Sequence, residues 1–153
     1  MDKKMFCFQC EQTVGCAGCT GNAGVCGKKA DTARLQDELT GALIGLARAV
    51  DSTTAISKRT GQVIIEGLFT TVTNVNFDDA SIENMIQKVR AEKERLVPDC
   101  SKGQSPCGKT GEYDMQQLWN ANEDIRSLKS LILFGIRGMA AYAYHANVLN
   151  YED

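Results

Sequence analysis

Five cysteines lie close together near the start of this chain, at Cys7, Cys10, Cys16, Cys19 and Cys26. Thiolates are soft ligands that suit iron-sulfur clusters, zinc or copper(I). Four of them within a short stretch can surround one metal centre without ligands from the rest of the fold. The N-terminal stretch therefore predicts a metal site.

Glycine recurs at every third position through the same stretch, from Gly15 to Gly27. Glycine allows positive φ and close approach of the backbone, so a loop around an inorganic centre can aim its amide N–H groups at sulfur. The run is too short for collagen and lacks its prolines. We prefer this interpretation to that of a flexible linker, because the glycines alternate with cysteines.

The chain holds seven cysteines, an odd number, and its first residues lack the apolar run of a secretory signal. No stretch reaches the length and apolar content needed to span a bilayer. We therefore expect a cytoplasmic protein, whose thiols stay reduced as ligands or free thiols instead of forming a disulfide framework. With 17 basic and 19 acidic residues, the formal net charge is −2, so we expect neither nucleic acid nor a membrane as a partner.

The cysteine spacing bears on which metal is bound. The pairs Cys7-x-x-Cys10 and Cys16-x-x-Cys19 are typical of zinc sites, but structural zinc sites commonly separate their pairs by about a dozen residues or more. Only five residues lie between these two pairs. The run also lacks the Cys-Pro ending of bacterial ferredoxins. Spacing alone favours an iron-sulfur cluster over zinc modestly, and a zinc site stays an alternative.

Beyond the loop, apolar residues recur at helical spacing in four segments. These segments are 31–50, 63–75, 79–97 and 122–149. Asp31 suits the N-cap of the first, and a carboxylate of Asp78-Asp79 can cap the third. The last segment opens at Asn122 with Glu123 and Asp124 in its first turn. Small residues along the last segment, among them Gly135 and Gly138, predict a central and well-buried helix. We expect an all-α protein in which residues 1–28 form a Cys/Gly-rich cluster-binding loop and residues 29–153 a helical bundle.

Four other residues have side chains that bear on a metal site or a packed core. Cys100 and Cys107 lie in an expected loop at 97–113 with no further ligand nearby, so we interpret them as free thiols. His145 lies on the last expected helix without a ligand-type neighbour one turn away, which favours a packed or surface residue. We expect Trp119 to be an anchor of the core.

Longer motifs carry a family resemblance. The segments Met5-Phe-Cys-Phe-Gln-Cys-Glu-Gln-Thr, Gly18-Cys-Thr and Gly24-Val-Cys-Gly-Lys28 closely resemble the opening of the hybrid-cluster proteins, also called prismane proteins or hydroxylamine reductases. Gly67-Leu-Phe-Thr-Thr-Val-Thr-Asn and Asn122-Glu-Asp-Ile-Arg-Ser-Leu are similar to the same family's N-terminal helical region, in the same order. The resemblance covers nearly the whole chain.

In that family four N-terminal cysteines bind a conventional cluster, usually 4Fe-4S and in some members 2Fe-2S, which passes electrons to a separate hybrid iron-sulfur-oxygen cluster. The resemblance implies that the cluster ligands are Cys7, Cys10, Cys19 and Cys26, and it favours 4Fe-4S over 2Fe-2S. Cys19 is preferred to Cys16 because Gly18-Cys19-Thr20 matches the context of the family's third ligand. Cys16 is then a neighbouring free thiol.

The family's full-length members are several times longer, and the ligands of their hybrid cluster lie in later domains. The resemblance implies an oxidoreductase that converts hydroxylamine to ammonia. As an N-terminal fragment or a truncated member, this chain alone would carry only the iron-sulfur, electron-transfer part. We expect a redox donor protein as its partner. We also expect the last helix to pack against a second copy of the chain or against the missing C-terminal domains. The alternative is a zinc-stabilised helical module for protein interaction.

Overall fold

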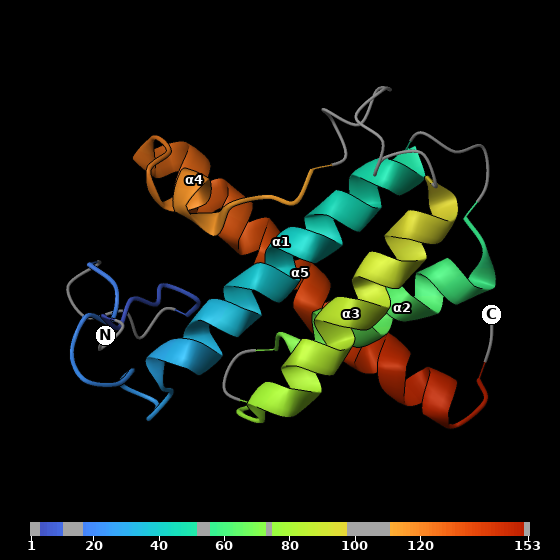
Figure 1. The fold of residues 1–153 in the computed structure, drawn as a ribbon, viewed down its shortest axis with the longest axis horizontal. Coiled ribbons are helices and arrows are strands. Elements are labelled where there is room, and N and C mark those ends of the chain that lie inside the picture. Colours follow the sequence, from blue (N-terminus) through green and yellow to red (C-terminus); the bar gives the residue numbers. More distant parts are fainter. Residues whose placement is uncertain (1–3, 11–16, 52–55, 73–74, 98–110, 152–153) are drawn as a thin grey trace.

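The chain folds into a bundle of helices with an irregular N-terminal loop at one end (Figure 1). In the computed structural model, the residues described are 4–10, 17–51, 56–72, 75–97 and 111–151. Within these ranges the helices are α1 (Ala30–Asp51), α2 (Lys58–Thr70), α3 (Asp79–Leu96), α4 (Met115–Trp119) and α5 (Glu123–Val148). The expected all-α fold is confirmed. The short helix α4 was not predicted.

The main core lies where α1 packs along α3, with α2 closing one side (Figure 1). Leu39, Leu46, Ile82 and Val89 have no exposed surface. Burying each such side chain stabilises the fold by about 1.5 to 3 kcal/mol. The helical spacing of the apolar residues in α1 and α3 thus predicted the two faces that meet.

Capping side chains set where two of the expected helices begin. Asp78 accepts a hydrogen bond from the amide of Ala80 at 3.2 Å, so the expected cap at Asp78-Asp79 is confirmed and is Asp78. Asn122, where the last segment was expected to open, is the N-cap of α5 and accepts from the amide of Asp124 at 3.0 Å. The prediction for Asp31 is wrong, because α1 already begins at Ala30 and Asp31 lies in its first turn. There its carboxylate suits the positive end of the helix dipole.

The second helix begins earlier and ends earlier than the apolar pattern predicted. Ser57 is its N-cap, with its hydroxyl accepting from the amide of Thr60 at 3.2 Å. The helix ends at Thr70, so Val75 lies outside it. The buried carboxylate of Glu92 ties α2 to α3, because it accepts from the hydroxyl of Thr60 at 2.7 Å and pairs with Arg95 at 2.6 Å.

The expectation that α5 is central and well buried is wrong. Only Arg137 and Ala140 of α5 are fully buried, and Gly135 and Gly138 face open space. The close approaches occur instead at Gly67, where an added Cβ would lie 2.7 Å from Leu43, and at Gly41, where it would collide with the carbonyl oxygen of Tyr113. In the described ranges, no helix combines the length and apolar content needed to cross a membrane.

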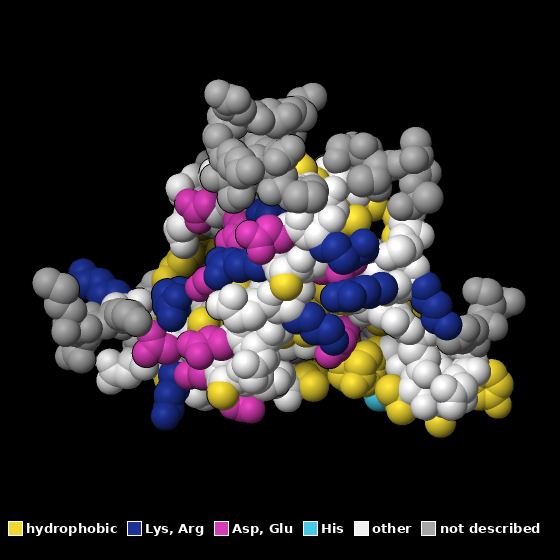
Figure 2. Space-filling view, turned by 45° about the vertical axis from the view of Figure 1, so that its right-hand side comes forward, with side chains coloured by type: hydrophobic (Ala, Val, Ile, Leu, Met, Phe, Trp, Pro, Cys, Tyr) yellow, Lys and Arg dark blue, Asp and Glu magenta, His cyan; other side chains and the backbone are white. Residues whose placement is uncertain are grey.

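One side of α5 packs on α2, whereas the opposite side carries a stripe of exposed apolar side chains. We call this stripe the α5 apolar face; it comprises Ile125, Leu128, Leu131, Ile132, Ile136, Met139 and Tyr142, which are 40% to 82% exposed. Elsewhere the surface is charged: Figure 2 shows Lys, Arg, Asp and Glu side chains across the middle of one face and hydrophobic side chains gathered along its lower edge. No described element covers the α5 apolar face.

Candidate metal centre

The N-terminal loop brings two of the predicted ligands side by side. The amide of Cys7 donates to the carbonyl of Cys19 at 3.1 Å, and the amide of Cys19 donates to the carbonyl of Cys7 at 2.7 Å. This antiparallel bridge joins residues from two different turns of the loop. Cys7 is buried and Cys10, Cys19 and Cys26 are half-buried, all four as free thiols. The loop lies at the N-terminal end of α1 (Figure 1).

Two glycines give the loop its path beside the cysteines. Gly18 and Gly27 have φ of +82° and +85°, in the left-handed region that favours glycine. At Gly18 an added Cβ would also lie 2.9 Å from the Phe6 ring. At Gly24 it would lie 3.4 Å from the sulfur of Cys26. Glycine is thus required at Gly18 and Gly27 for conformation, whereas an added Cβ at Gly24 would make only ordinary contacts.

A chain of buried polar side chains fastens the loop to α1. Lys28 donates from Nζ to Oε1 of Gln9 at 2.7 Å. Gln9 in turn donates from Nε2 to Oδ1 of Asp37 at 2.7 Å and to the carbonyl of Ala33 at 3.0 Å. Lys28 and Gln9 are 2% and 7% exposed. We call Lys28, Gln9 and Asp37 the loop anchor; sequence analysis did not single out any of the three.

The environment of the loop shifts the pKa values of three groups. Burial raises the pKa of the Cys7 thiol, against a hydrogen bond from the backbone of Gln9 and the charge of Lys28, which both lower it. Burial raises the pKa of Asp37 to about 6, although the hydrogen bond from Gln9 and the charges of Arg137 and Lys28 oppose the shift. Burial lowers the pKa of Arg137 to about 10. Desolvation is therefore the main electrostatic effect at this end of the bundle.

Arg137 is the buried contribution of α5 to this region. Its guanidinium donates from Nε to the hydroxyl of Thr71 and from Nη2 to the hydroxyl of Thr40, both at 3.0 Å. The charges of Asp37 and Cys7 act on it favourably. Arg137 in α5 is therefore tied to α1 through Thr40 and to the C-cap of α2 through Thr71.

An aromatic cluster covers the other side of the loop. The rings of Phe6 and Phe8, which flank Cys7, lie 5.2 Å and 5.0 Å from that of Trp119 in α4. The guanidinium of Arg126 stacks on Trp119 at 4.6 Å. Trp119 is half-buried and packs on the cysteine loop, not in the main core. Short α4, which begins at the cap Asp114, thus positions an apolar wall beside Cys7.

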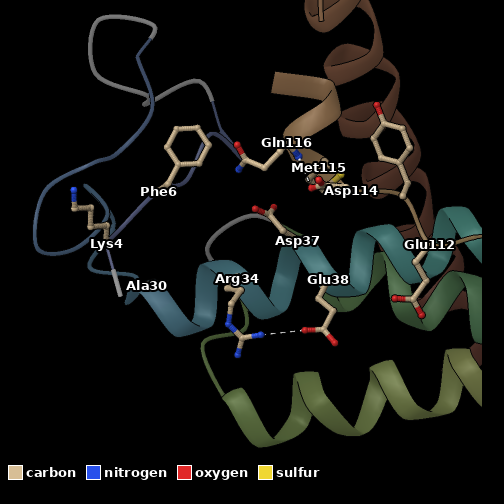
Figure 3. A pocket seen from close by; sticks show the side chains of 11 residues that line it. Lys4, Phe6, Ala30, Arg34, Asp37, Glu38, Glu112, Asp114, Met115 and Gln116 are labelled. Atoms are coloured by element: carbon tan, nitrogen blue, oxygen red, sulfur yellow. Dashed lines mark hydrogen bonds and ion pairs between the residues drawn. The ribbon is translucent and has the colours of Figure 1, made fainter. Parts of the chain in front are cut away.

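A cavity of about 640 Å³ opens between the loop, α1 and the segment that leads into α4. Figure 3 shows Asp37 on α1 facing Asp114 and Gln116 across it, with Phe6 nearby. No cysteine lines this cavity. It therefore borders the loop anchor, not the predicted metal ligands.

The chemistry of the donor set suits a soft metal or an iron-sulfur group, because Cys7, Cys10, Cys19 and Cys26 are free thiols. In the part of the chain that the structure describes, no three Cys, His, Asp or Glu side chains lie close enough to hold one metal ion. Cys7 and Cys19 are brought together through their backbones. The assignment of four ligands stays a prediction.

The remaining candidates lie elsewhere. Cys16, Cys100 and Cys107 fall outside the described residues. His145 is exposed on α5, and its ring lies 5.4 Å from that of Phe69 and 5.9 Å from that of Tyr144. These ring contacts agree with its interpretation as a packed or surface residue.

The fold and the loop define an all-α protein with a cysteine-lined N-terminal loop docked on its first helix. Residues 5–153 match the Prismane/CO dehydrogenase family, and the chain belongs to this family. The sequence-based resemblance is thereby confirmed.

Several curated relatives are named hydroxylamine reductase. Those of Methanococcus vannielii and Porphyromonas gingivalis are each 39% identical to the chain, over 97% and 100% of its length. That of Methanocella arvoryzae is 40% identical over 97%. The matched region is only 31% to 32% of these relatives, so the chain spans about a third of their length. No solved structure matches the chain.

Proposed function

We propose that this chain is the N-terminal iron-sulfur domain of a hydroxylamine-reductase-like protein and that it relays electrons toward a second, hybrid cluster whose ligands it does not contain. Cys7, Cys10, Cys19 and Cys26 hold the iron-sulfur group, with 4Fe-4S favoured over 2Fe-2S. When bound, this group accepts and donates one electron at a time.

The observation that carries the proposal is the pairing of Cys7 with Cys19 across two backbone hydrogen bonds. The pairing supports Cys19 as a ligand because it fixes one cysteine of the Cys7-x-x-Cys10 pair beside a residue of the other turn. Burial of Cys7 beside Phe6 and Phe8 would keep water from the sulfur. Exclusion of water is one of the factors that set the potential of an iron-sulfur group.

Residues around the cysteines have defined tasks in this proposal. The loop anchor holds the Cys7 turn against α1, and the aromatic wall of Phe6, Phe8 and Trp119 shields it from the side of α4. Gly18 allows the Cys19 turn to pass close to Phe6. The chain therefore supplies a setting that excludes water from Cys7.

The activity of the whole protein is part of the proposal. The relatives' name indicates reduction of hydroxylamine, and we propose that the longer protein performs it in the cytoplasm with electrons from a redox donor protein. This chain alone would not reduce hydroxylamine. Its exposed α5 apolar face supports packing against a further polypeptide, which is either a second copy or the domains that the relatives carry beyond the matched region.

The test is anaerobic reconstitution of the chain with iron and sulfide. We expect bound iron and acid-labile sulfide in about equal amounts and a brown protein whose visible absorption bleaches with dithionite. Cys7→Ser, Cys19→Ser and Cys26→Ser should each lose most of the iron, whereas the control Cys107→Ser should not. Retention of full iron content by Cys7→Ser and Cys26→Ser would refute the ligand assignment.

The zinc-stabilised module remains the alternative function, because thiolates also bind zinc tetrahedrally. Zinc in such a module would stabilise the fold, and the module itself would bind another protein. A colourless protein that purifies with one zinc ion and gains no sulfide on reconstitution would establish this alternative in place of the redox function.

A further inference from the structure

The exposed side chains of α5 follow a repeat of seven residues. With Ile125 as position a of a heptad abcdefg, positions a and d fall on Ile125, Leu128, Ile132, Gly135, Met139 and Tyr142. All six are exposed to solvent. A coiled coil forms when a second helix covers such a seam of a and d positions. The α5 apolar face therefore has the pattern of one half of a coiled coil.

The positions beside this seam are exposed as well, whereas the rest of α5 faces its own bundle. Leu131 at position g and Ile136 at position e are 68% and 40% exposed. On the opposite side of the helix, Arg137 is buried, and the ring of Tyr144 stacks on that of Phe69 in α2 at 4.4 Å between centres. One side of α5 thus packs within the chain, and the other presents positions a, d, e and g to solvent.

Two charged side chains lie at the edges of the seam. Asp124 is at position g and Lys129 at position e, and both are exposed. Among the described residues neither forms an ion pair, whereas Arg34, Lys88 and Arg90 on α1 and α3 each pair with a carboxylate. Asp124 and Lys129 are five positions apart, so they do not face each other on one helix.

These two charges distinguish between the orientations of a partner helix. In a parallel pair, position g of one helix lies beside position e of the next heptad in the other helix, and opposite charges there set orientation. Asp124 of one copy would then lie beside Lys129 of a second copy, and the two-fold axis repeats the pair. In an antiparallel pair, position e faces position e, and the other e positions of α5 are the uncharged Ile136 and Ala143. The charges therefore favour a parallel pair.

The middle of the seam has room for close approach of a second helix. An added Cβ at Gly135 or Gly138 would meet nothing within 4 Å. The distance between two packed helices depends on the side chains at their contact, so glycine at this point permits a short one. These two residues have no close neighbour within the chain, and a partner helix would supply one.

We propose that two copies of this chain associate through α5, as a parallel two-stranded coiled coil with an Asp124–Lys129 ion pair at each edge. This assigns the α5 apolar face to a second copy. The dimer is independent of the iron-sulfur group, because none of its contact residues lies in the cysteine loop. Its presence or absence is therefore a separate question from whether the loop binds iron.

The experiment measures association of the full chain, kept reduced so that its cysteines do not link copies. Sedimentation equilibrium gives the dissociation constant of the unaltered chain, of Lys129→Glu, of Asp124→Lys and of the control Glu94→Lys on the exposed side of α3. Lys129→Glu and Asp124→Lys should each raise the dissociation constant about tenfold, because two pairs change from attraction to repulsion. High salt should reduce this difference. Glu94→Lys should behave as the unaltered chain does.

Mixing two variants tests the parallel orientation. In a mixture of Lys129→Glu with Asp124→Lys, only the parallel heterodimer pairs opposite charges at both edges. Native mass spectrometry resolves this heterodimer, because the two variants differ in mass, and it should exceed both homodimers. The matched mixture of Lys129→Glu with Glu94→Lys has the same net charges but lacks this pairing, so its heterodimer should not be enriched.

Circular dichroism confirms that each variant keeps its helices. If Asp124→Lys does not fold, Lys129→Glu alone decides, through weaker association that high salt restores. A monomeric unaltered chain at every concentration would overturn the dimer. Association that Lys129→Glu leaves unchanged, or equal enrichment in the two mixtures, would overturn the parallel coiled coil.

Discussion

Gln9 donates a hydrogen bond of 2.7 Å to Asp37, a residue 28 positions later in the chain. Through this contact the turn that holds Cys7 is fixed to the N-terminal part of α1. The same amide accepts from the buried Lys28, so one side chain connects both ends of the cysteine loop to the bundle. The position of the predicted metal ligands therefore depends on a residue that is not itself a ligand.

Replacing Gln9 by alanine should destabilise the chain. The change leaves the Lys28 ammonium and the Ala33 carbonyl without their buried partner, which costs about 2 to 3 kcal/mol. Urea denaturation of the metal-free chain measures the effect. The control Gln87→Ala, on the exposed side of α3, should change the free energy of unfolding by less than about 0.5 kcal/mol. Equal stability of the two variants would show that the loop anchor does not hold the loop.

Asp37 should make the stability of the metal-free chain fall as pH rises from about 4 to about 6. Folding raises the pKa of Asp37 from 3.8 to about 6, so the folded chain binds this proton more tightly than the unfolded chain. The stabilisation that protonated Asp37 gives the folded chain is fully present below its unfolded pKa. It is lost as the pH rises through its folded pKa. Its size is at most about 3 kcal/mol.

The variant Asp37→Asn tests this pH dependence. Asparagine can still accept from Gln9 but carries no charge, so the variant should be more stable than the unaltered chain at pH 7 and should lose the decline between pH 4 and 6. Glu83→Gln, on the exposed side of α3, is the control and should retain the decline. Parallel pH profiles for all three chains would contradict the assignment to Asp37.

Gly18 should not tolerate alanine. At φ of +82° an alanine costs about 1 to 2 kcal/mol, and its Cβ would also press on the Phe6 ring. We expect Gly18→Ala to lower both the unfolding free energy and the iron content after reconstitution. Gly21→Ala is the matched control, because that position has open space apart from one carbonyl at 3.8 Å and no positive φ. Similar iron content in both variants would count against a conformational need at Gly18.

The α5 apolar face should make the isolated chain self-associate. Leu131 and Met139 are 68% and 72% exposed, and burying such side chains against another chain is favourable. Sedimentation velocity over a range of concentrations should show species larger than one chain. The double variant Leu131→Glu with Met139→Glu should sediment as a monomer, whereas Ala91→Glu on α3 should not differ from the unaltered chain. A concentration-independent monomer of the unaltered chain would exclude self-association.

The sequence by itself determined the elements that depend on local order. Apolar spacing marked the buried faces of α1 and α3, and the side chains of Asp78 and Asn122 marked where two helices begin. Cysteine and glycine spacing marked the loop, and its longer motifs indicated the family. These features are readable because helical period, capping and thiol chemistry act over a few residues.

Only the tertiary structure decided how distant parts meet. Lys28 and Lys29 are identical in type and adjacent, yet only Lys28 is buried, because Gln9 lies where its ammonium can donate. Gly135 and Gly138 predicted close helix packing that occurs instead at Gly41 and Gly67. The small residues of α5 have the same sequence signature whether a neighbouring helix covers them or not. Helices pack through residues that are far apart in the sequence. A local sequence pattern therefore does not determine which helix surface another element will cover.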